Sequence, residues 1–264
     1  MADKKGNDTK YIYTFTVIMT TVVAVVLGVL FFGLKGVHAK NEAVFNKRAI
    51  LASLGTNLPT PVAEMTDEEV QDIFDNRMTT YVVNRSGEDL DDDIDNIDLA
   101  KERKKPEDER KFPLYVYQND EGKNFYILSV RGNGLWDEIW GNVALEDDLT
   151  TIAGTSFDHK AETPGLGAEI KDNPKFAESF QGKKVLDSYN GVYTPDVVKV
   201  TVKKGAITEP EYEVAAISGA TVTSVGVAEM LNRGIAYYLP FLEKIKNGEV
   251  AAATTTDAVG MLVQ

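Results

Sequence analysis

The sequence predicts an α+β protein: a single N-terminal transmembrane helix followed by one domain of mostly antiparallel strands with flanking helices. Three observations predict this class. Residues 11–34 carry no charged side chain. From residue 112 onward, short apolar runs alternate with turn residues, as is typical of antiparallel strands. A segment from about 224 to 247 has apolar residues at helical spacing.

The apolar segment 11–34 is long enough to cross a bilayer as one helix. At 1.5 Å per residue it spans a hydrocarbon core of about 30 Å, and Tyr11, Tyr13 and Lys35 stand where interfacial anchors occur. A cleavable signal peptide is the alternative, because Val37-His38-Ala39 is similar to a cleavage site. The apolar run, however, exceeds the roughly 7–15 residues of a signal core. We therefore expect a retained anchor in contact with lipid; the flanking charges do not decide its orientation.

Composition excludes several classes of function. The net charge is −13 over 264 residues, so nucleic acid is not an expected partner. The absence of cysteine excludes disulfides, cysteine-ligated iron–sulfur clusters and thiol catalysis. His38 and His159 are the only histidines, so no zinc site is expected. Any redox chemistry must come from a non-thiol cofactor.

Charge and hydropathy divide the chain into five segments. They are a short N-terminus (1–10), the apolar span (11–34), a helical and acidic connecting region (35–111), a folded domain (112–248) and a flexible C-terminal tail (249–264). The tail has no sustained periodic face, which is typical of a loose terminus.

The connecting region is expected to hold two helices and an acidic loop. The first helix continues from the apolar span to about residue 54, where Gly55 ends it. The second is expected over 67–77, with Thr66 as N-cap and Glu69 completing a capping box.

The acidic loop, residues 86–111, partly matches a calcium-binding template. Four acidic residues occupy its positions 1, 3, 5 and 12: Asp91, Asp93, Asp95 and Glu102. Asn96 stands where the template has glycine, and Asp98 where it has an apolar residue. These departures favour a solvated loop over a metal site.

The domain is expected to begin with a hairpin and end with a helix. The hairpin joins 112–117 to 124–132 through a turn at 119–122. Further strands are expected at 139–145, 150–157, 184–188, 196–203 and 211–217, a short helix at 171–179, and a final helix at 224–247 with a break at Pro240.

Residues 218–224, SGATVTS, lie between the last expected strand and the final helix. A small-residue turn at a helix N-terminus presents unpaired N–H groups and suits a phosphate. On these grounds alone, a helix capped by Ser or Thr is the alternative.

Two further segments accompany this one: 157–170, FDHKAETPGLGAEI, and 132–141, which contains GNGLW and IWG. Together the three segments resemble the FMN-binding domain family. Among its members the chain most resembles the C subunits of sodium-translocating NADH:quinone oxidoreductases, with the G subunits of Rnf electron-transport complexes as nearest relatives.

The resemblance implies that FMN is joined through its phosphate, as a phosphoester, to the hydroxyl of Thr221. It implies attachment by a separate flavin transferase that uses FAD and a metal ion. It further implies other subunits as partners, a place in the cell inner membrane with the large domain on the periplasmic side, a cytoplasmic N-terminus, and electron transfer from NADH towards quinone coupled to sodium export. One departure is Ala215, which stands where the motif usually carries an Asp.

Other residues of these segments, together with Lys204, are candidate cofactor contacts. The set comprises Trp136, His159, Glu162, Thr163, Gly165, Leu166, Gly167, Lys204, Ser218, Gly219, Ala220, Val222, Thr223 and Ser224. Glu162 and Thr163 can hydrogen-bond polar edges of a flavin, and Leu166 can cover a face. Trp136 can stack on the ring or belong to the core. His159 can donate a proton or hold its loop.

Some roles stay open. Thr223 is a competing attachment point. Otherwise its hydroxyl bonds the phosphate or caps the helix together with Ser224. Lys203 or Lys204 can place a cation near the phosphate or lie in a solvated turn. No residue is expected to be catalytic or to ligate a metal. The resemblance implies that the chain alone is an electron carrier within an enzyme complex. An Rnf-type subunit, an extracytoplasmic flavin reductase and a membrane-tethered binding protein are the alternatives.

Overall fold

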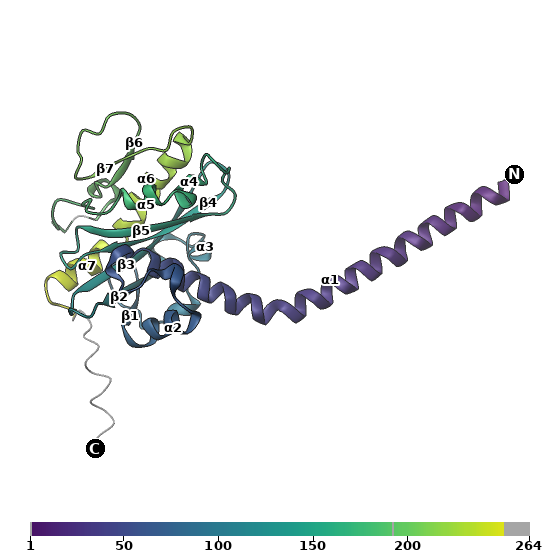
Figure 1. Cartoon of the computed structure of the whole chain (residues 1–264), viewed down its shortest axis with the longest axis horizontal. Coiled ribbons are helices and arrows are strands. Elements are labelled where there is room, and N and C mark those ends of the chain that lie inside the picture. Colours follow the sequence, from purple (N-terminus) through teal and green to yellow (C-terminus); the bar gives the residue numbers. More distant parts are fainter. Residues whose placement is uncertain (1, 192, 251–264) are drawn as a thin grey trace, which may run out of the picture. The chain divides into compact units, whose positions relative to one another are not determined.

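The computed structural model describes residues 2–191 and 193–250 (Figure 1). Most of the expected tail, 251–264, therefore lies outside the described residues. The chain forms two compact units, residues 1–46 and 47–264.

The first unit consists of most of helix α1, Ala2–Ala52. Among the described residues one helical stretch, Thr9–Ala52, is long and apolar enough to cross a membrane, and its most apolar window has a mean hydropathy of 2.7. No part of that window is buried inside the protein. The hydroxyls of Thr20 and Thr21 donate to the carbonyls of Thr16 and Val17, at 2.9 and 2.7 Å. These bonds satisfy polar groups within the helix, as a lipid environment requires.

The second unit is built on a five-stranded antiparallel sheet in which the strands follow one another in chain order. The strands are β1 Met78–Val83, β2 Phe112–Gln118, β3 Asn124–Asn133, β4 Glu138–Leu145 and β5 Ile152–His159. The expected α+β class and the expected hairpin at 112–132 are confirmed. Strand β1 lies inside the segment that the sequence had placed in a helical and acidic connecting region, so that segment contributes a strand to the sheet.

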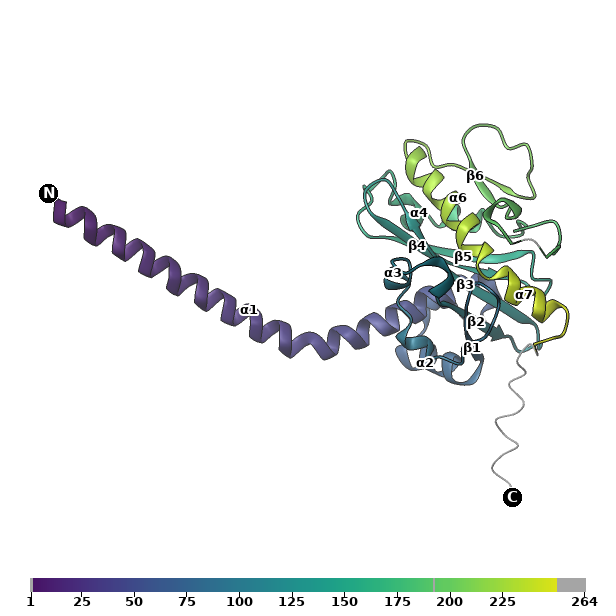
Figure 2. The same ribbon diagram turned by 180° about the vertical axis from the view of Figure 1, so that it is seen from behind.

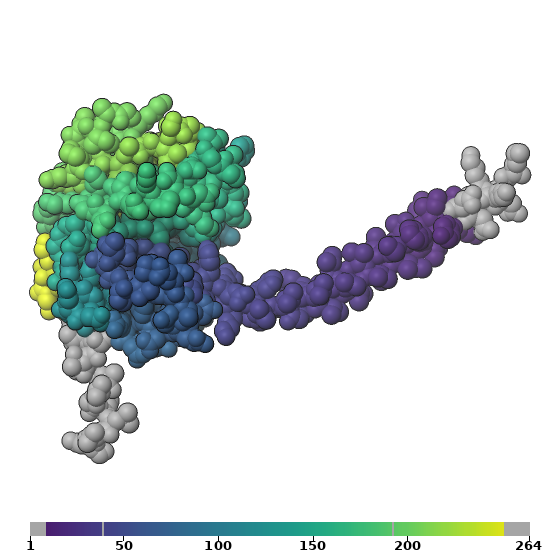
Figure 3. Space-filling view, in the orientation of Figure 1, coloured from purple at the N-terminus to yellow at the C-terminus, as the bar shows by residue number. Residues whose placement is uncertain are grey.

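Helices cover both faces of this sheet. Leu128 and Val130 of β3 belong to the core cluster that includes α6 (Thr221–Ala236) and α7 (Leu239–Lys246), which cross one face in Figure 2. Ile127, the residue before Leu128, belongs to the cluster on the other face, with the end of α1 and α2 (Asp67–Asn76). Figure 3 shows these blue N-terminal segments covering that face. The division follows the two-residue period of a strand.

Helix α2 begins as the sequence predicts. The hydroxyl of Thr66 accepts the N–H of Glu69 at 3.2 Å, and the Glu69 carboxylate accepts the N–H of Thr66 at 2.6 Å. The remaining elements are short: η1 Gly55–Asn57, η2 Val62–Glu64, η3 Ile94–Asn96, α3 Leu99–Glu102, η4 Glu107–Glu109, α4 Glu169–Asp172, α5 Pro174–Glu178, η5 Pro195–Val197, β6 Thr201–Lys203 and β7 Glu213–Ala215.

Several expected elements differ. Residues 184–188 form no strand, and Lys184 makes only an isolated bridge to Thr151. The strand expected over 196–203 is reduced to β6, which pairs with β7 in parallel. The helix expected over 171–179 is divided at Asn173, whose side chain accepts the N–H of Lys175 and caps α5.

The acidic loop does not gather its carboxylates. Glu102, the twelfth position of the calcium template, is buried, and its oxygens accept the Lys105 ammonium at 2.8 Å and the Lys111 N–H at 3.0 Å. Asp93 accepts the N–H of Asp95. In the described part of the chain, no group of three or more His, Asp or Glu side chains could hold a metal ion.

Candidate functional site

The three motif segments meet at one end of the domain. Residues 134–137 join β3 to β4, residues 160–168 follow β5, and residues 216–220 lead into α6. Figures 1 and 2 both show the first turn of α6 beside α4. Because α6 packs along β3, its N-terminus comes beside the β3–β4 loop.

Glu162 links the three segments. Its side chain is buried, with 5% of the residue exposed. One carboxylate oxygen accepts the hydroxyl of Thr223 at 2.6 Å, and the other accepts the main-chain N–H of Trp136 at 3.0 Å. Both oxygens are therefore used by protein donors. The sequence suggested that Glu162 bonds a flavin edge, whereas in the structure it holds the three segments together.

Glycine permits the close approach of these segments. A Cβ at Gly167 would overlap the Glu162 carboxylate and lie 2.7 Å from the Thr223 hydroxyl. Gly219 has a φ of +80°, a conformation that L side chains rarely adopt, and a Cβ there would lie 2.9 Å from the Leu166 side chain. Leu166 thus lies against the turn that precedes α6.

The loop after β5 is held by local hydrogen bonds. Nδ1 of His159 accepts the main-chain N–H of Glu162 at 3.2 Å, so this histidine does position its loop. The Thr163 carbonyl accepts the N–H groups of Leu166 and Ala168, both at 3.1 Å. The Thr163 hydroxyl accepts the indole N–H of Trp136 at 3.2 Å, which ties the β3–β4 loop to it.

Helix α6 begins at Thr221, three residues earlier than expected. Its N-cap is Ala220, whose side chain cannot cap, and the structure has no side-chain cap there. The hydroxyls expected to cap the helix are used elsewhere. Thr223 donates to Glu162, and Ser224 accepts the N–H of Ile217 at 3.1 Å.

The start of α6 therefore has free donors. Among the described residues, no protein acceptor takes the main-chain N–H groups of Thr221, Val222 and Thr223. The half-buried hydroxyl of Thr221 likewise has no protein hydrogen bond within the described chain. Unpaired N–H groups and the positive end of the helix dipole favour an anion at this position.

An apolar surface surrounds this turn. Six large apolar residues of the described part of the domain are exposed, and five of them belong to the three segments or the first turns of α6: Leu135, Trp136, Leu166, Val222 and Val225. We call these five the motif patch; they are between 43% and 67% exposed. Leu135 and Val225 were not among the expected contacts. Val225 lies one turn after Thr221 on the same helix, which is the signal that could have identified it.

Other expected residues lie apart from this arrangement. The Lys203 ammonium pairs with the Glu213 carboxylate at 2.6 Å, and Lys204 is exposed in the following turn. Within the described residues, no hydrogen bond or ion pair joins either lysine to residues 218–224. Ser218 and Gly165 are exposed, and Ala215 is the exposed last residue of β7.

Comparisons with known proteins identify the family of the chain. A family model of the FMN-binding domain matches residues 134–236, which include all three segments from Gly134 onward. The C subunit of the Na(+)-translocating NADH-quinone reductase of Pseudomonas aeruginosa is 33% identical, over 89% of this chain and 97% of the relative. The corresponding C subunit of a Neisseria meningitidis serogroup A strain is 31% identical, over 94% and 98%.

Two solved structures are also similar. The C subunit of the Na(+)-translocating NADH-quinone reductase from Parabacteroides distasonis has a TM-score of 0.66 and 32% identity, covering 79% of this chain and 96% of that chain. NqrC of Shewanella oneidensis has a TM-score of 0.62 and 25% identity, covering 76% and 96%. The chain belongs to the family of C subunits of the Na(+)-translocating NADH-quinone reductase.

Proposed function

We propose that this chain carries FMN, joined through its phosphate to Thr221, and passes electrons through it on the way from NADH to quinone. The observation that carries the proposal is the start of α6. Within the described chain, a threonine hydroxyl without a protein hydrogen bond and three unpaired N–H groups lie there beside the motif patch. Family membership and the matching FMN-binding domain support the cofactor.

The start of α6 fits the phosphate end of FMN. The N–H groups of Thr221, Val222 and Thr223 would bind phosphate oxygens, and the helix dipole favours their negative charge. The hydroxyl of Thr221 would supply the ester oxygen. Since Ala220 leaves the helix uncapped, no side chain of the described residues competes with the phosphate for these donors.

The motif patch fits the apolar ring system. Trp136, Leu166 and Val222 are exposed on the three segments and would cover part of an isoalloxazine. When bound, the flavin supplies one-electron and two-electron redox chemistry. The protein's part is to hold the ring at the surface, where partner proteins of the complex can reach it, and to exclude water from one side.

Attachment would require a separate enzyme. A threonine hydroxyl is a weak nucleophile and needs an adjacent base. In the described residues no such base bonds to Thr221, and the buried Glu162 carboxylate is used by Thr223 and Trp136. This arrangement supports a flavin transferase as the agent of maturation.

We further propose that α1 spans the cell inner membrane once, with residues 1–10 in the cytoplasm and the large domain on the periplasmic side. The exposed apolar surface of α1 supports the anchor. The names of the relatives support other subunits as partners and sodium translocation as the coupled process. Export is the direction that we propose.

Co-expression with a flavin transferase tests the proposal. The purified chain should be yellow, and its flavin fluorescence should stay with the polypeptide after denaturation and gel electrophoresis. A chain that loses all flavin on denaturation would contradict covalent attachment. A chain that never acquires flavin would contradict the carrier function itself.

A further inference from the structure

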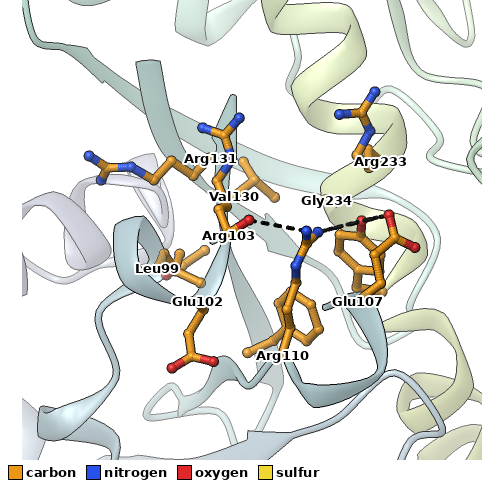
Figure 4. Close-up of a pocket in the computed structure, with 12 residues that line it drawn as sticks. Leu99, Glu102, Arg103, Glu107, Arg110, Val130, Arg131, Arg233 and Gly234 are labelled. Carbon is orange, nitrogen blue, oxygen red and sulfur yellow. Dashed lines mark hydrogen bonds and ion pairs between the residues drawn. The ribbon is translucent and has the colours of Figure 1, made fainter. Parts of the chain in front are cut away.

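A second candidate site lies at the other end of α6. A cavity of about 150 Å³ is lined by residues of α3, η4, β3 and the last turn of α6 (Figure 4). Four arginines from different segments line it: Arg103, Arg110, Arg131 and Arg233. Two carboxylates, Glu102 and Glu107, also line it. The lining thus has a net charge of +2 in a chain whose net charge is −13.

Protein contacts fix three of the four guanidinium groups, those of Arg103, Arg110 and Arg131. Arg110 donates to the carbonyls of Lys105 and Arg103 at 3.0 and 3.1 Å. Figure 4 shows its guanidinium group at the centre of the cavity, between Arg103 and Glu107. Arg131 donates to Glu138 at 2.6 Å and lies 4.8 Å from the centre of the Trp140 ring. These side chains are therefore held in place before any ligand arrives, which lowers the entropy cost of binding.

The carboxylates neutralise this cluster only in part. Glu107 forms an ion pair with Arg110 at 3.9 Å but also pairs with Arg85. The Glu138 carboxylate forms ion pairs with the guanidinium groups of both Arg131 and Arg103, at 2.6 and 3.5 Å. Burial lowers the pKa of Arg103, and the guanidinium groups of Arg131, Arg233 and Arg110 lower it further, although Glu138 opposes them. The carboxylate of Glu102 is occupied by Lys105 and the Lys111 N–H.

Arg233 is the least constrained of the four. It extends from the last turn of α6 on the side of the cavity opposite α3 (Figure 4). Its side chain is exposed, and it makes no hydrogen bond or ion pair within the described residues. Its five N–H donors are therefore available to a ligand.

We propose that this cavity binds a phosphate group. Guanidinium groups bind phosphate oxygens through paired, charge-assisted hydrogen bonds. The volume suits one such group, whereas sites for larger organic ligands measure about 300–1,000 Å³. The phosphate group could be free phosphate or the headgroup of an anionic lipid, since both present the same oxygens.

This site is separate from the one at Thr221. Arg233 follows Thr221 by twelve positions in α6, which corresponds to about 18 Å along the helix axis. One residue of the cavity, Arg103, also contacts the chain close to the Thr221 site. Arg103 donates to the Gly132 carbonyl at 3.0 Å and to the Asn133 side chain at 3.2 Å, immediately before the β3–β4 loop.

Calorimetric titration of the detergent-solubilised full chain with inorganic phosphate, in low-salt chloride buffer, tests the proposal. Phosphate should bind saturably, and Arg233→Gln should raise its Kd about tenfold or more. Arg233→Lys should raise the Kd less, because the lysine keeps the positive charge but loses the paired N–H donors of the guanidinium group. The matched control is Lys175→Gln, an equal charge change at an exposed residue of α5 that does not line the cavity, and it should leave the Kd within about twofold.

A second titration distinguishes the sources of the ligand. If dioctanoyl phosphatidate displaces phosphate and dioctanoyl phosphatidylcholine does not, the ligand is a lipid headgroup. If neither lipid competes, it is a free phosphate. Binding that does not saturate, or a Kd that Arg233→Gln leaves unchanged in a folded protein, would overturn the proposal. The second result would assign the phosphate elsewhere, for example to the start of α6.

Discussion

The hydroxyl of Thr223 donates to the buried carboxylate of Glu162 at 2.6 Å, across 61 positions of sequence. This bond fixes the first turn of α6 against the loop that follows β5. The second oxygen of the same carboxylate fixes the β3–β4 loop through the N–H of Trp136. One side chain thus sets the relative position of all three motif segments.

Replacement of Glu162 should show this role directly. In Glu162→Leu, the Trp136 N–H and the Thr223 hydroxyl lose their acceptor in a buried position, which should lower the free energy of unfolding by about 2–5 kcal/mol. In Glu162→Gln, the amide oxygen can accept from Trp136 and the amide nitrogen can donate to Thr223, so the loss should be small. Denaturant titrations of both variants measure the difference, with the exposed Glu178→Leu as control. Equal stability of the Leu and Gln variants would contradict the role of Glu162 as a link.

The two tryptophans provide a test of where the ring lies. Trp136 is exposed on the motif patch, whereas Trp140 belongs to β4 and lies beside Arg131 of β3. Flavin attached at Thr221 should quench Trp136 emission by contact and energy transfer. The flavin-dependent quenching should therefore largely disappear in Trp136→Phe and persist in Trp140→Phe. The reverse pattern would place the ring away from the patch.

Acid stability should depend on Glu213. The Lys203 ammonium, assisted by the N–H groups of Glu209 and Thr208, lowers the pKa of Glu213 to about 2, against the opposing effect of burial. In the unfolded chain, a glutamate side chain has a pKa of about 4.3. Ionised Glu213 therefore stabilises the fold above about pH 4.3, and this contribution is lost as the pH falls towards 2. The Tm difference between wild type and Glu213→Gln should be largest near neutrality and shrink below pH 4. The control Glu211→Gln, at an exposed residue, should give no such pH dependence. If it gives the same one, the Tm difference of Glu213→Gln arises from net charge.

Membrane topology can be tested in intact spheroplasts. Added protease should degrade residues 47–250, because the domain is proposed to lie on the periplasmic side, while a cytoplasmic marker protein stays intact. Complete protection of the domain would contradict the orientation. A mature N-terminus at Lys40 would show instead that the span is a cleaved signal peptide.

Sequence alone predicted the features that depend on local chemistry. The Thr66–Glu69 capping box and the hairpin turn at 119–122 each use residues a few positions apart, and both form as expected. The break before the last helix also occurs beside Pro240, which lies in the first turn of α7.

Features that depend on distant partners were missed. Val185 and Leu186 are buried like strand residues, but no neighbouring strand pairs with them. Conversely, β1 exists because β2 pairs with it over its whole length. A local pattern cannot show whether a pairing strand exists.

The same limit applies to the candidate site. The segments were identifiable from their residues, but the function of Glu162 was not, because its two donors come from the β3–β4 loop and from α6. The early start of α6 was missed for a similar reason. A cap by Ser224 was one of the alternatives, but its hydroxyl accepts the N–H of Ile217 instead.

The central claim is that FMN is esterified to Thr221, and mass spectrometry of the chain co-expressed with a flavin transferase tests it most directly. The peptide containing residues 218–224 should be heavier by FMN less water, with fragment ions placing the addition on Thr221. Thr221→Val should abolish the adduct and leave the fold intact, because its hydroxyl bonds to no described residue. Thr223→Val should keep the adduct but lose about 1–3 kcal/mol of stability, since it removes the donor to Glu162. An adduct found on Thr223, or retained in Thr221→Val, would contradict the account.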